Sequence, residues 1–154
     1  MTETRTDAEQ IRDLLAAYCW HMDRGEFDAL GALFVHASMG DGTTPDGPTL
    51  SGADEIAALY RDGCILYDGV PRTKHVCTNA IIEFHDDGDH ATSRSCFLVE
   101  QQLEDFPLQP IVGGRYHDRF ERVDGRWRFA ERRFFVDLVG DVSRHQRLEL
   151  RDQA

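Results

Sequence analysis

The stretch Gly114–Phe129, GRYHDRFERVDGRWRF, decides the fold. Polar and apolar residues alternate on both sides of the pair Asp124-Gly125, and a period of two is typical of a half-buried strand. An Asp-Gly pair between two such runs favours a tight hairpin turn. We therefore expect one strand over Gly114–Arg122 and a last, long strand over Arg126–Val139.

A second hairpin is predicted upstream of the first. Residues Arg72–Phe84 read as a strand that begins after Pro71, and the acidic turn Asp86–Asp89 leads into a further strand over Ala91–Gln102. Two prolines mark Leu103–Pro110 as the loop that joins the two hairpins. The second half of the chain therefore predicts an antiparallel sheet.

The beginning of the chain has a helical pattern instead. Thr6–Glu9 reads T-x-x-E, a capping box that opens a helix. Apolar residues then recur at steps of three and four and form one face, at Ile11, Leu14, Leu15, Tyr18 and Met22. Gly25 is expected to end this helix.

Two shorter helices are expected next, over Phe27–Phe34 and over Ala53–Arg61, the latter capped by Ser51. The segment Met39–Gly52 is rich in Gly, Pro, Thr and Asp, and predicts a loop. Helices followed by antiparallel hairpins predict an α+β fold, in which a curved, mostly antiparallel sheet wraps around the N-terminal helices. Such a sheet leaves a pocket for a small ligand at its open end.

The length predicts one domain over residues 1–154, with a core at about 7–139 and a polar tail at 140–154. The net charge is −11, and the sixteen arginines alternate with acidic residues along the later strands. Nucleic acids and anionic membranes bind clustered cations, so we expect neither as a partner.

Targeting and cysteine patterns point to the cytoplasm. No apolar run approaches the roughly 20 residues of a membrane helix, and the N-terminus has no signal-peptide pattern. The four cysteines have no C-x-x-C spacing and are expected to be small core residues rather than disulfides or zinc ligands: Cys19, Cys64, Cys77 and Cys96.

Three dispersed residues, Tyr18, Asp23 and His75, could supply proton-transfer chemistry. A carboxylate that orients an imidazole, with a phenol nearby, can move a proton to or from carbon. Strand alternation would place four residues on one face, namely His75, Cys77, Asn79 and Ile81. The residues alone leave two non-catalytic roles open, a histidine that only satisfies its own hydrogen bonds and an aspartate in a solvated helix end.

Three patterns together resemble the SnoaL-like branch of the nuclear-transport-factor-like superfamily. They are Y-x4-D at Tyr18 and Asp23, H-x-x-x-N at His75–Asn79, and G-R-Y-x-D-R-F-x-R-x-D-G-R-W-R-F-x-x-R at Gly114–Arg132. The resemblance covers roughly residues 11–137 and is to bile-acid dehydratases, lindane dehydrochlorinase and, more distantly, scytalone dehydratase. It implies a cystatin-like, cone-shaped α+β barrel with the pocket inside.

The resemblance also implies the roles of four residues. Neutral His75 would take a proton from carbon while Asp23 holds its tautomer. Tyr18 would donate a hydrogen bond to the substrate carbonyl or to the departing hydroxyl, and Arg132 would supply a fixed cation near the leaving group. No metal or organic cofactor is implied. The dehydrochlorinase has lysine in place of Tyr18, which favours elimination of water over dehalogenation for this chain. The bile-acid dehydratases have a further acidic residue on the middle strands that has no clear counterpart here, and Glu100 is only nearby.

The remaining polar and aromatic residues fit structural roles. His85 and His90 flank an acidic turn, which favours exposure, and the strand neighbours His117 and Asp118 face opposite ways and so are not expected to act as a pair. Nothing singles out the two remaining histidines of the helical half, His21 and His36. Core packing is favoured for Tyr60, Tyr116 and Trp127, although the two tyrosines could instead close a cavity.

The sequence therefore predicts a cofactor-independent lyase of the dehydratase type, or an isomerase, that acts on a cyclic, mostly apolar hydroxy or keto compound such as a steroid, terpenoid or polyketide. Two alternatives stay open: a non-catalytic small-molecule carrier, and the small structural subunit of a ring-hydroxylating dioxygenase. The resemblance also implies a homo-oligomer, a dimer or trimer, formed through the outer sheet face that includes Arg119–Phe135.

Overall fold

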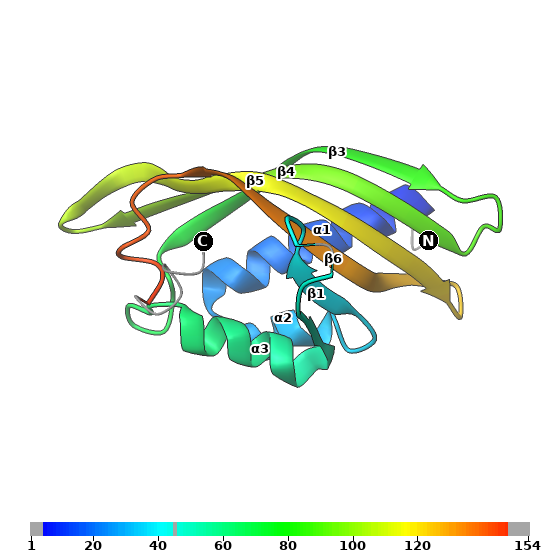
Figure 1. Ribbon diagram of the computed structural model, residues 1–154, viewed down its shortest axis with the longest axis horizontal. Helices are drawn as coiled ribbons and strands as arrows, with labels where there is room; N and C mark the ends of the chain where they lie inside the picture. The colour runs from blue at the N-terminus through cyan, green and yellow to red at the C-terminus, as the bar shows by residue number, and fades with distance from the viewer. Residues whose placement is uncertain (1–4, 45, 148–154) are drawn as a thin grey trace.

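The computed structural model describes residues 5–44 and 46–147. In chain order the elements are α1 (Asp7–Arg24), α2 (Phe27–Ala32), β1 (Ser38–Asp41), β2 (Thr49–Ser51), α3 (Gly52–Gly63), β3 (Thr73–Phe84), β4 (His90–Leu103), β5 (Phe106–Val123) and β6 (Arg126–Val139). The strands form one six-stranded sheet in the order β2-β1-β6-β5-β4-β3. This curved, open sheet arches over the helices (Figure 1), which confirms the predicted α+β class.

Helix α1 begins and ends where its sequence predicts. The Thr6 hydroxyl accepts a hydrogen bond from the Glu9 N–H at 3.3 Å, and the Glu9 carboxylate accepts one from the Thr6 N–H at 2.7 Å. Gly25 follows the helix with a left-handed φ of 69°. A Cβ at this position would lie 2.4 Å from the carbonyl oxygen of Gly69, so only glycine fits. The end of α1, which carries Asp23, is therefore fixed in place.

The segment Met39–Gly52, predicted as a loop, contains two short strands. β1 pairs in parallel with β6, and it pairs antiparallel with β2. Met39 is buried and lies opposite Leu50, which packs against the same core. These two apolar side chains therefore favour pairing of the two short strands. The prediction for Ser51 is also wrong in its detail, because its hydroxyl makes no capping bond; its N–H instead donates to the Glu55 carboxylate at 2.8 Å.

The segment Leu103–Pro110, predicted as a loop, is mostly strand. Leu103 already pairs with Phe106, so only two residues turn the chain from β4 into β5. Pro110 lies opposite Glu100, next to a shift in the register. Proline lacks the N–H that a regular ladder needs and is tolerated at such irregular positions, which explains why the prolines do not end the strand.

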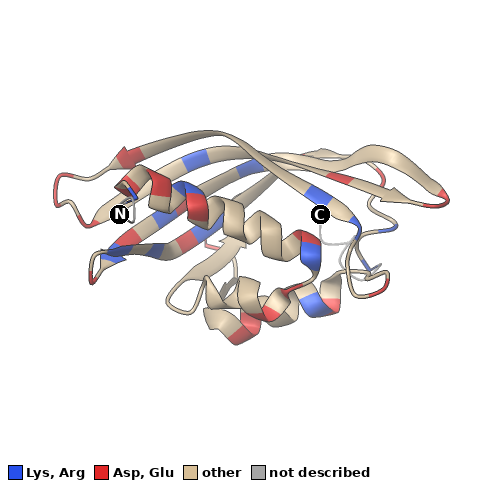
Figure 2. Ribbon diagram, turned by 180° about the vertical axis from the view of Figure 1, so that it is seen from behind, with Lys and Arg blue, Asp and Glu red and all other residues tan. Residues whose placement is uncertain are grey.

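The core lies between the concave face of the sheet and the helices. Phe34 at the end of α2 stacks on Phe129 of β6 with ring centroids 4.7 Å apart, and Trp127 is buried as expected. Acidic and basic residues alternate along β5 and β6 rather than gathering by sign (Figure 2). No helix in the described part of the chain is long and apolar enough to cross a membrane.

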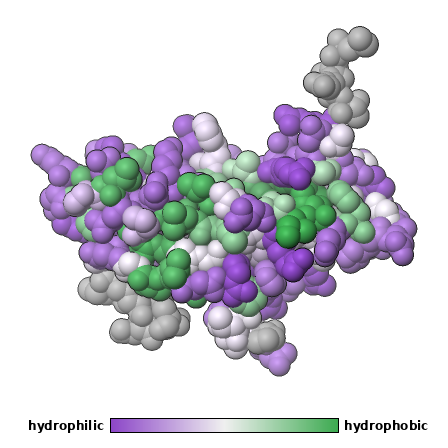
Figure 3. Space-filling model, turned by 90° about the horizontal axis from the view of Figure 1, so that it is seen from above, coloured by the Kyte–Doolittle hydropathy of each residue, from purple (hydrophilic) through white to green (hydrophobic). Residues whose placement is uncertain are grey.

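The outer face of the sheet mixes charged and apolar side chains (Figure 3). Arg115 forms a two-bond ion pair with Asp137 at 2.7 and 2.9 Å. Val76 and Leu138 are large apolar residues that stay exposed, with 42% and 68% of their surface accessible.

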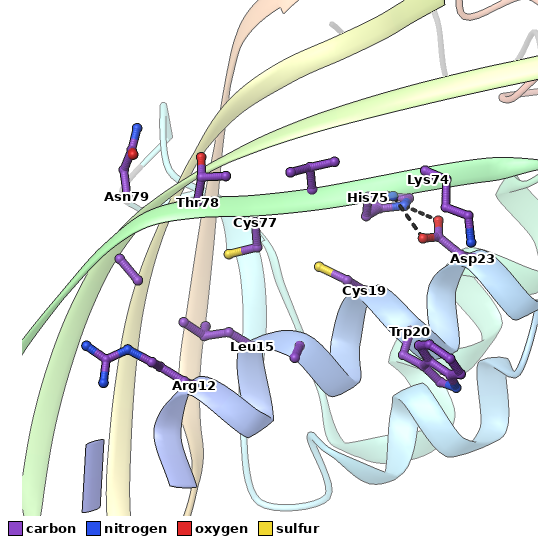
Figure 4. Close-up of a pocket in the computed structure, with 13 residues that line it drawn as sticks. Arg12, Leu15, Cys19, Trp20, Asp23, Lys74, His75, Cys77, Thr78 and Asn79 are labelled. Carbon is purple, nitrogen blue, oxygen red and sulfur yellow. Dashed lines mark hydrogen bonds and ion pairs between the residues drawn. The ribbon is translucent and has the colours of Figure 1, made fainter. Parts of the chain in front are cut away.

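A β-bulge at Asn79 divides strand β3 into two halves. Three steps along β3, from Thr78 to Ile81, match only two steps along β4, and Asn79 has a left-handed φ of 57°. Asparagine tolerates this conformation better than most residues. The prediction that Asn79 and Ile81 share a face with His75 and Cys77 is wrong, because the extra residue reverses the alternation. Ile81 is 54% exposed, while Cys77 points toward helix α1 (Figure 4).

Candidate active site

The structure brings together Asp23 from the end of α1 and His75 from the start of β3 (Figure 4). The carboxylate Oδ1 of Asp23 lies 2.6 Å from His75 Nδ1. Its Oδ2 accepts the backbone N–H of His75 at 2.8 Å, and the Thr73 hydroxyl donates to Oδ1 at 2.9 Å. Three hydrogen bonds therefore fix the carboxylate, and the carboxylate fixes the imidazole.

These contacts determine the protonation of the pair. Burial would raise the pKa of Asp23, but the hydrogen bonds from His75 and Thr73 outweigh it, and the pKa lies below its usual value. Asp23 is therefore ionised at neutral pH and accepts these hydrogen bonds, so Nδ1 of His75 is the donor within the pair. The lone pair of Nε2 remains available to accept another proton.

His75 lies on the wall of an internal cavity of about 240 Å³ between the helices and the concave face of the sheet. Most of the lining is apolar, including Met22, Phe97, Val99 and Val112. The polar side chains that reach it include two tyrosines from the helices, Tyr18 and Tyr60, together with Tyr116, His75 and His145. A largely apolar chamber with a few convergent polar groups is the usual form of a small-molecule site.

Tyr18 does reach the cavity, and its hydroxyl has a partner that the sequence did not indicate. The hydroxyl oxygens of Tyr18 and Tyr60 are 2.5 Å apart, and the Tyr60 hydroxyl lies 3.2 Å from the sulfur of Met39. Burial raises the pKa of both phenols, so both stay protonated at neutral pH. Core packing was the favoured role for Tyr60, with closure of a cavity as the alternative, and the structure places Tyr60 on the cavity wall.

His145 is the cavity residue that sequence reasoning missed. His145 belongs to the predicted tail, and its backbone carbonyl accepts a hydrogen bond from the Ile65 N–H at 2.9 Å. The Arg147 N–H donates to the Gly63 carbonyl at 3.0 Å. The described part of the tail thus packs on its own chain, beyond the predicted core boundary; residues 148–154 lie outside the described residues. No local pattern marks His145, because a long-range contact places it.

The His145 ring is buried and lies 6.5 Å from the His75 ring, centroid to centroid. Within the described residues its Nδ1 has no hydrogen-bond partner. Burial, helped by the nearby His75, lowers the pKa of His145 to about 4, although Asp23 opposes this shift. His145 is therefore a neutral imidazole with unused hydrogen-bonding capacity at the cavity wall.

Arg132 points inward but does not line the cavity, which alters its expected role. Its guanidinium makes two hydrogen bonds to Asp118, at 2.8 and 2.9 Å, and both side chains are buried. Its Cζ lies 4.3 Å from the ring centroid of Tyr18 and 3.8 Å from that of Tyr116. The cation is thus held behind the tyrosines. Asp118 faces away from its neighbour His117, as expected, but its true partner lies on the next strand.

The other candidates lie away from the cavity. Glu100 borders an outer hollow instead. His90 is exposed and bonds Asp87 at 2.7 Å, and His21 bonds Glu26 at 2.8 Å. Among the residues that the structure describes, no group of three or more His, Cys, Asp and Glu side chains is arranged to hold a metal ion.

Comparison with known proteins agrees with this architecture. A model of the SnoaL-like domain matches residues 3–133, so the chain belongs to the SnoaL-like family. No curated protein sequence matches it.

Three similar solved structures come from Novosphingobium aromaticivorans. One is a nuclear-transport-factor-like protein with a cystatin-like fold (24% identity, TM-score 0.65, covering 89% of this chain and 85% of that chain). Another is a candidate scytalone dehydratase (21% identity, TM-score 0.67, covering 88% of this chain and 87% of that chain). The third is the β subunit of a candidate aromatic-ring-hydroxylating dioxygenase (21% identity, TM-score 0.65, covering 85% of this chain and 89% of that chain). At these identities the structures show the shared fold alone.

Proposed function

We propose that this SnoaL-like protein is a cofactor-independent lyase or isomerase that removes a proton from carbon in a cyclic, mostly apolar hydroxy or keto compound. The observation that carries the proposal is the 2.6 Å bond between Asp23 and His75 at the wall of the apolar cavity. A carboxylate-oriented imidazole is a suitable general base at neutral pH.

In the proposed reaction, His75 Nε2 accepts the proton from a carbon next to a carbonyl group. Asp23 keeps the imidazole in the required tautomer and stabilises the imidazolium that forms. The electron pair of the broken C–H bond moves onto the carbonyl oxygen, which becomes an enolate. In an isomerase His75 returns the proton to another carbon; in a dehydratase it passes to the departing hydroxide, which leaves as water.

The tyrosine pair and His145 are suited to hold the substrate oxygens. The Tyr60 hydroxyl has one proton, which it can donate either to the Met39 sulfur or to Tyr18; when it donates to Tyr18, the Tyr18 proton can reach the enolate oxygen, where a fixed donor stabilises developing charge. Neutral His145 can hydrogen-bond a second oxygen of the substrate. These groups take the place expected of Arg132, whose guanidinium is paired with Asp118 and does not line the cavity.

The size of the cavity narrows the substrate class. Its volume of about 240 Å³ is below the roughly 300–1,000 Å³ typical of sites for drug-sized ligands. We therefore favour a compound of one or two rings over a four-ring steroid.

Exchange of hydrogen for deuterium tests the proposal without a known product. A bicyclic ketone such as 2-tetralone is incubated with the protein in D2O, and loss of its α-proton signals is followed by NMR. We expect faster exchange with the wild-type protein, and a fall of about 10²–10⁴-fold in the enzyme-dependent rate for His75→Gln.

The surface supplies a matched control. His90 also bonds a carboxylate, Asp87, at 2.7 Å but is exposed, so His90→Gln should leave the exchange rate unchanged. Equal rates for the two variants would contradict the proposed role of His75. Binding of 2-tetralone in the cavity without any enhanced exchange would favour the non-catalytic carrier.

A further inference from the structure

Helix α1 and strand β3 face each other across an open groove of about 650 Å³ that lies outside the internal cavity. Cys19 of the helix and Cys77 of the strand both line this groove, with their sulfur atoms directed toward one another (Figure 4). Neither cysteine is in a disulfide. The proposed reaction uses neither of them.

The surroundings make the two sulfurs unequal. The interaction with the neighbouring Cys19 thiol lowers the pKa of Cys77 to about 6 against the opposing effect of burial, and Ser95 and Arg132 add to the lowering. Cys77 is also the less buried of the two. The thiolate form, which is the nucleophile, therefore belongs to Cys77 at neutral pH, with the Cys19 thiol as its neighbour.

The other two cysteines lack this arrangement. Burial raises the pKa of Cys64 to about 12, which keeps it a thiol. Cys96 lies opposite Thr78 in the sheet, one residue out of phase with Cys77, and so projects from the other face. The chain thus contains its own controls for thiol chemistry.

We propose that Cys19 and Cys77 are a reversible redox pair that a peroxide closes into a disulfide joining α1 to β3. The Cys77 thiolate attacks one oxygen of hydrogen peroxide, the O–O bond breaks, and the products are a sulfenic acid and, after protonation, water. The Cys19 sulfur then attacks the sulfenic sulfur, and a second water leaves. In sum, two thiols and one hydrogen peroxide give one disulfide and two waters, and a dithiol reductant reverses the change.

The bond would form beside the proposed catalytic pair. Cys19 precedes Asp23 by one helical turn, and Cys77 follows His75 by two residues on the same side of β3. The cross-link is independent of the proposed function, because it can be detected with no substrate present. Its effect on deuterium exchange would be a separate measurement.

Peptide mapping tests the pair directly, since trypsin places each cysteine on a different peptide: 13–24, 62–72, 75–94 and 95–115. The wild-type protein is treated with one equivalent of hydrogen peroxide at neutral pH, unfolded, alkylated and digested. We expect free thiols to fall from four to two and peptides 13–24 and 75–94 to appear joined, with two hydrogens fewer than their sum. Dithiothreitol should restore both.

Two variants sharpen the test. Cys96→Ser should retain the joined peptides, whereas Cys19→Ser should abolish them and leave Cys77 oxidised to a sulfenic or sulfinic acid. Recovery of both alkylated peptides from the peroxide-treated wild type would overturn the proposal, as would linkage of Cys77 to Cys96 or to a second chain. The wild-type map alone decides the matter if a serine variant does not fold.

Discussion

Two buried acid–base pairs of the protein have hydrogen bonds of similar length but different surroundings. Asp23 and His75 are 2.6 Å apart and retain 10% and 7% of their side-chain exposure, and His75 lies at the cavity wall. Asp118 and Arg132 are 2.8 Å apart, with 0% and 1% exposure, and are enclosed by aromatic rings. One pair contains an imidazole with a lone pair that is not committed to its partner, and the other contains a permanent cation.

Burial of charge alone therefore does not identify the reactive group. Both oxygens of Asp118 are occupied by the guanidinium of Arg132. Nη1 of Arg132 has no hydrogen-bond partner among the described residues, but the pair does not line the cavity, and it supports the rings of Tyr18 and Tyr116 from behind. The imidazole of His75 has one nitrogen committed to Asp23 and the other available. The Asp118–Arg132 pair therefore shapes the cavity wall, whereas the Asp23–His75 pair can act on a bound molecule through the free nitrogen of His75.

The largest expected effect comes from breaking the enclosed pair. Arg132→Met leaves the Asp118 carboxyl buried without its partner, and we expect the free energy of unfolding to fall by about 3–5 kcal/mol. Urea denaturation followed by circular dichroism measures this. The double variant Arg132→Met/Asp118→Leu should lose much less than Arg132→Met alone. A double variant that is less stable than the single one would show that the pair itself, rather than the orphaned charge, dominates.

The next effect concerns pH and His145, which is neutral in the fold with a pKa of about 4 but titrates near 6.5 when unfolded. Between these values the unfolded chain binds the extra proton, so stability rises with pH across this window and falls as the solution is acidified. We expect a loss of about 2 kcal/mol from pH 8 to pH 5. Denaturation curves of His145→Gln should lack this part of the decline; an identical decline in both proteins would contradict the assignment.

A smaller effect is expected from Asp23→Asn, which keeps the shape of the side chain but removes its charge. The bond to His75 Nδ1 loses its charge assistance, at a cost of about 1.5 kcal/mol in unfolding free energy. Proton NMR provides the specific readout, because the downfield Nδ1–H resonance of His75 should shift upfield or disappear. Asp87→Asn, at the exposed histidine–aspartate pair, should change stability by less than about 0.5 kcal/mol.

The smallest effect tests the bulge that follows His75 along β3. Asn79→Val places a β-branched residue in a left-handed conformation and should cost about 1 kcal/mol, while Asn79→Gly should be nearly neutral because glycine adopts it freely. Thermal melting compares the two. Thr78→Val, at the neighbouring exposed strand position, is the control and should not destabilise. Equal melting temperatures for the Val and Gly variants would argue against strain at this position.

Much of the fold could be predicted because its signals are local. The capping box at Thr6, the glycine at Gly25 and the Asp-Gly hairpin each act over a few residues, and the structure has a helix start, a helix end and a strand turn there. The bulge gave only a weak signal, since an asparagine such as Asn79 is disfavoured in strands but does not by itself mark a bulge. Pro110 gave a misleading one, because a register shift accommodates it.

The candidate site was predictable only in part, for a related reason. Tyr18, Asp23 and His75 stand in patterns that a family resemblance can supply, and the structure brings Asp23 to His75. Nothing local ties Tyr60 to Tyr18 or carries His145 to the cavity, since these contacts join residues 42 apart or more. Sequence alone likewise left open whether the guanidinium of Arg132 would reach a substrate in the cavity.

The packing of the tail has a consequence for the order in which the site is assembled. The cavity wall combines the first helix with His145, which is anchored to Ile65. A nascent chain that has emerged only as far as strand β6 can already join Asp23 to His75, but its chamber still lacks one side. The binding site is therefore complete only after the segment near residue 145, which follows the sheet in the chain, has emerged and packed against Ile65.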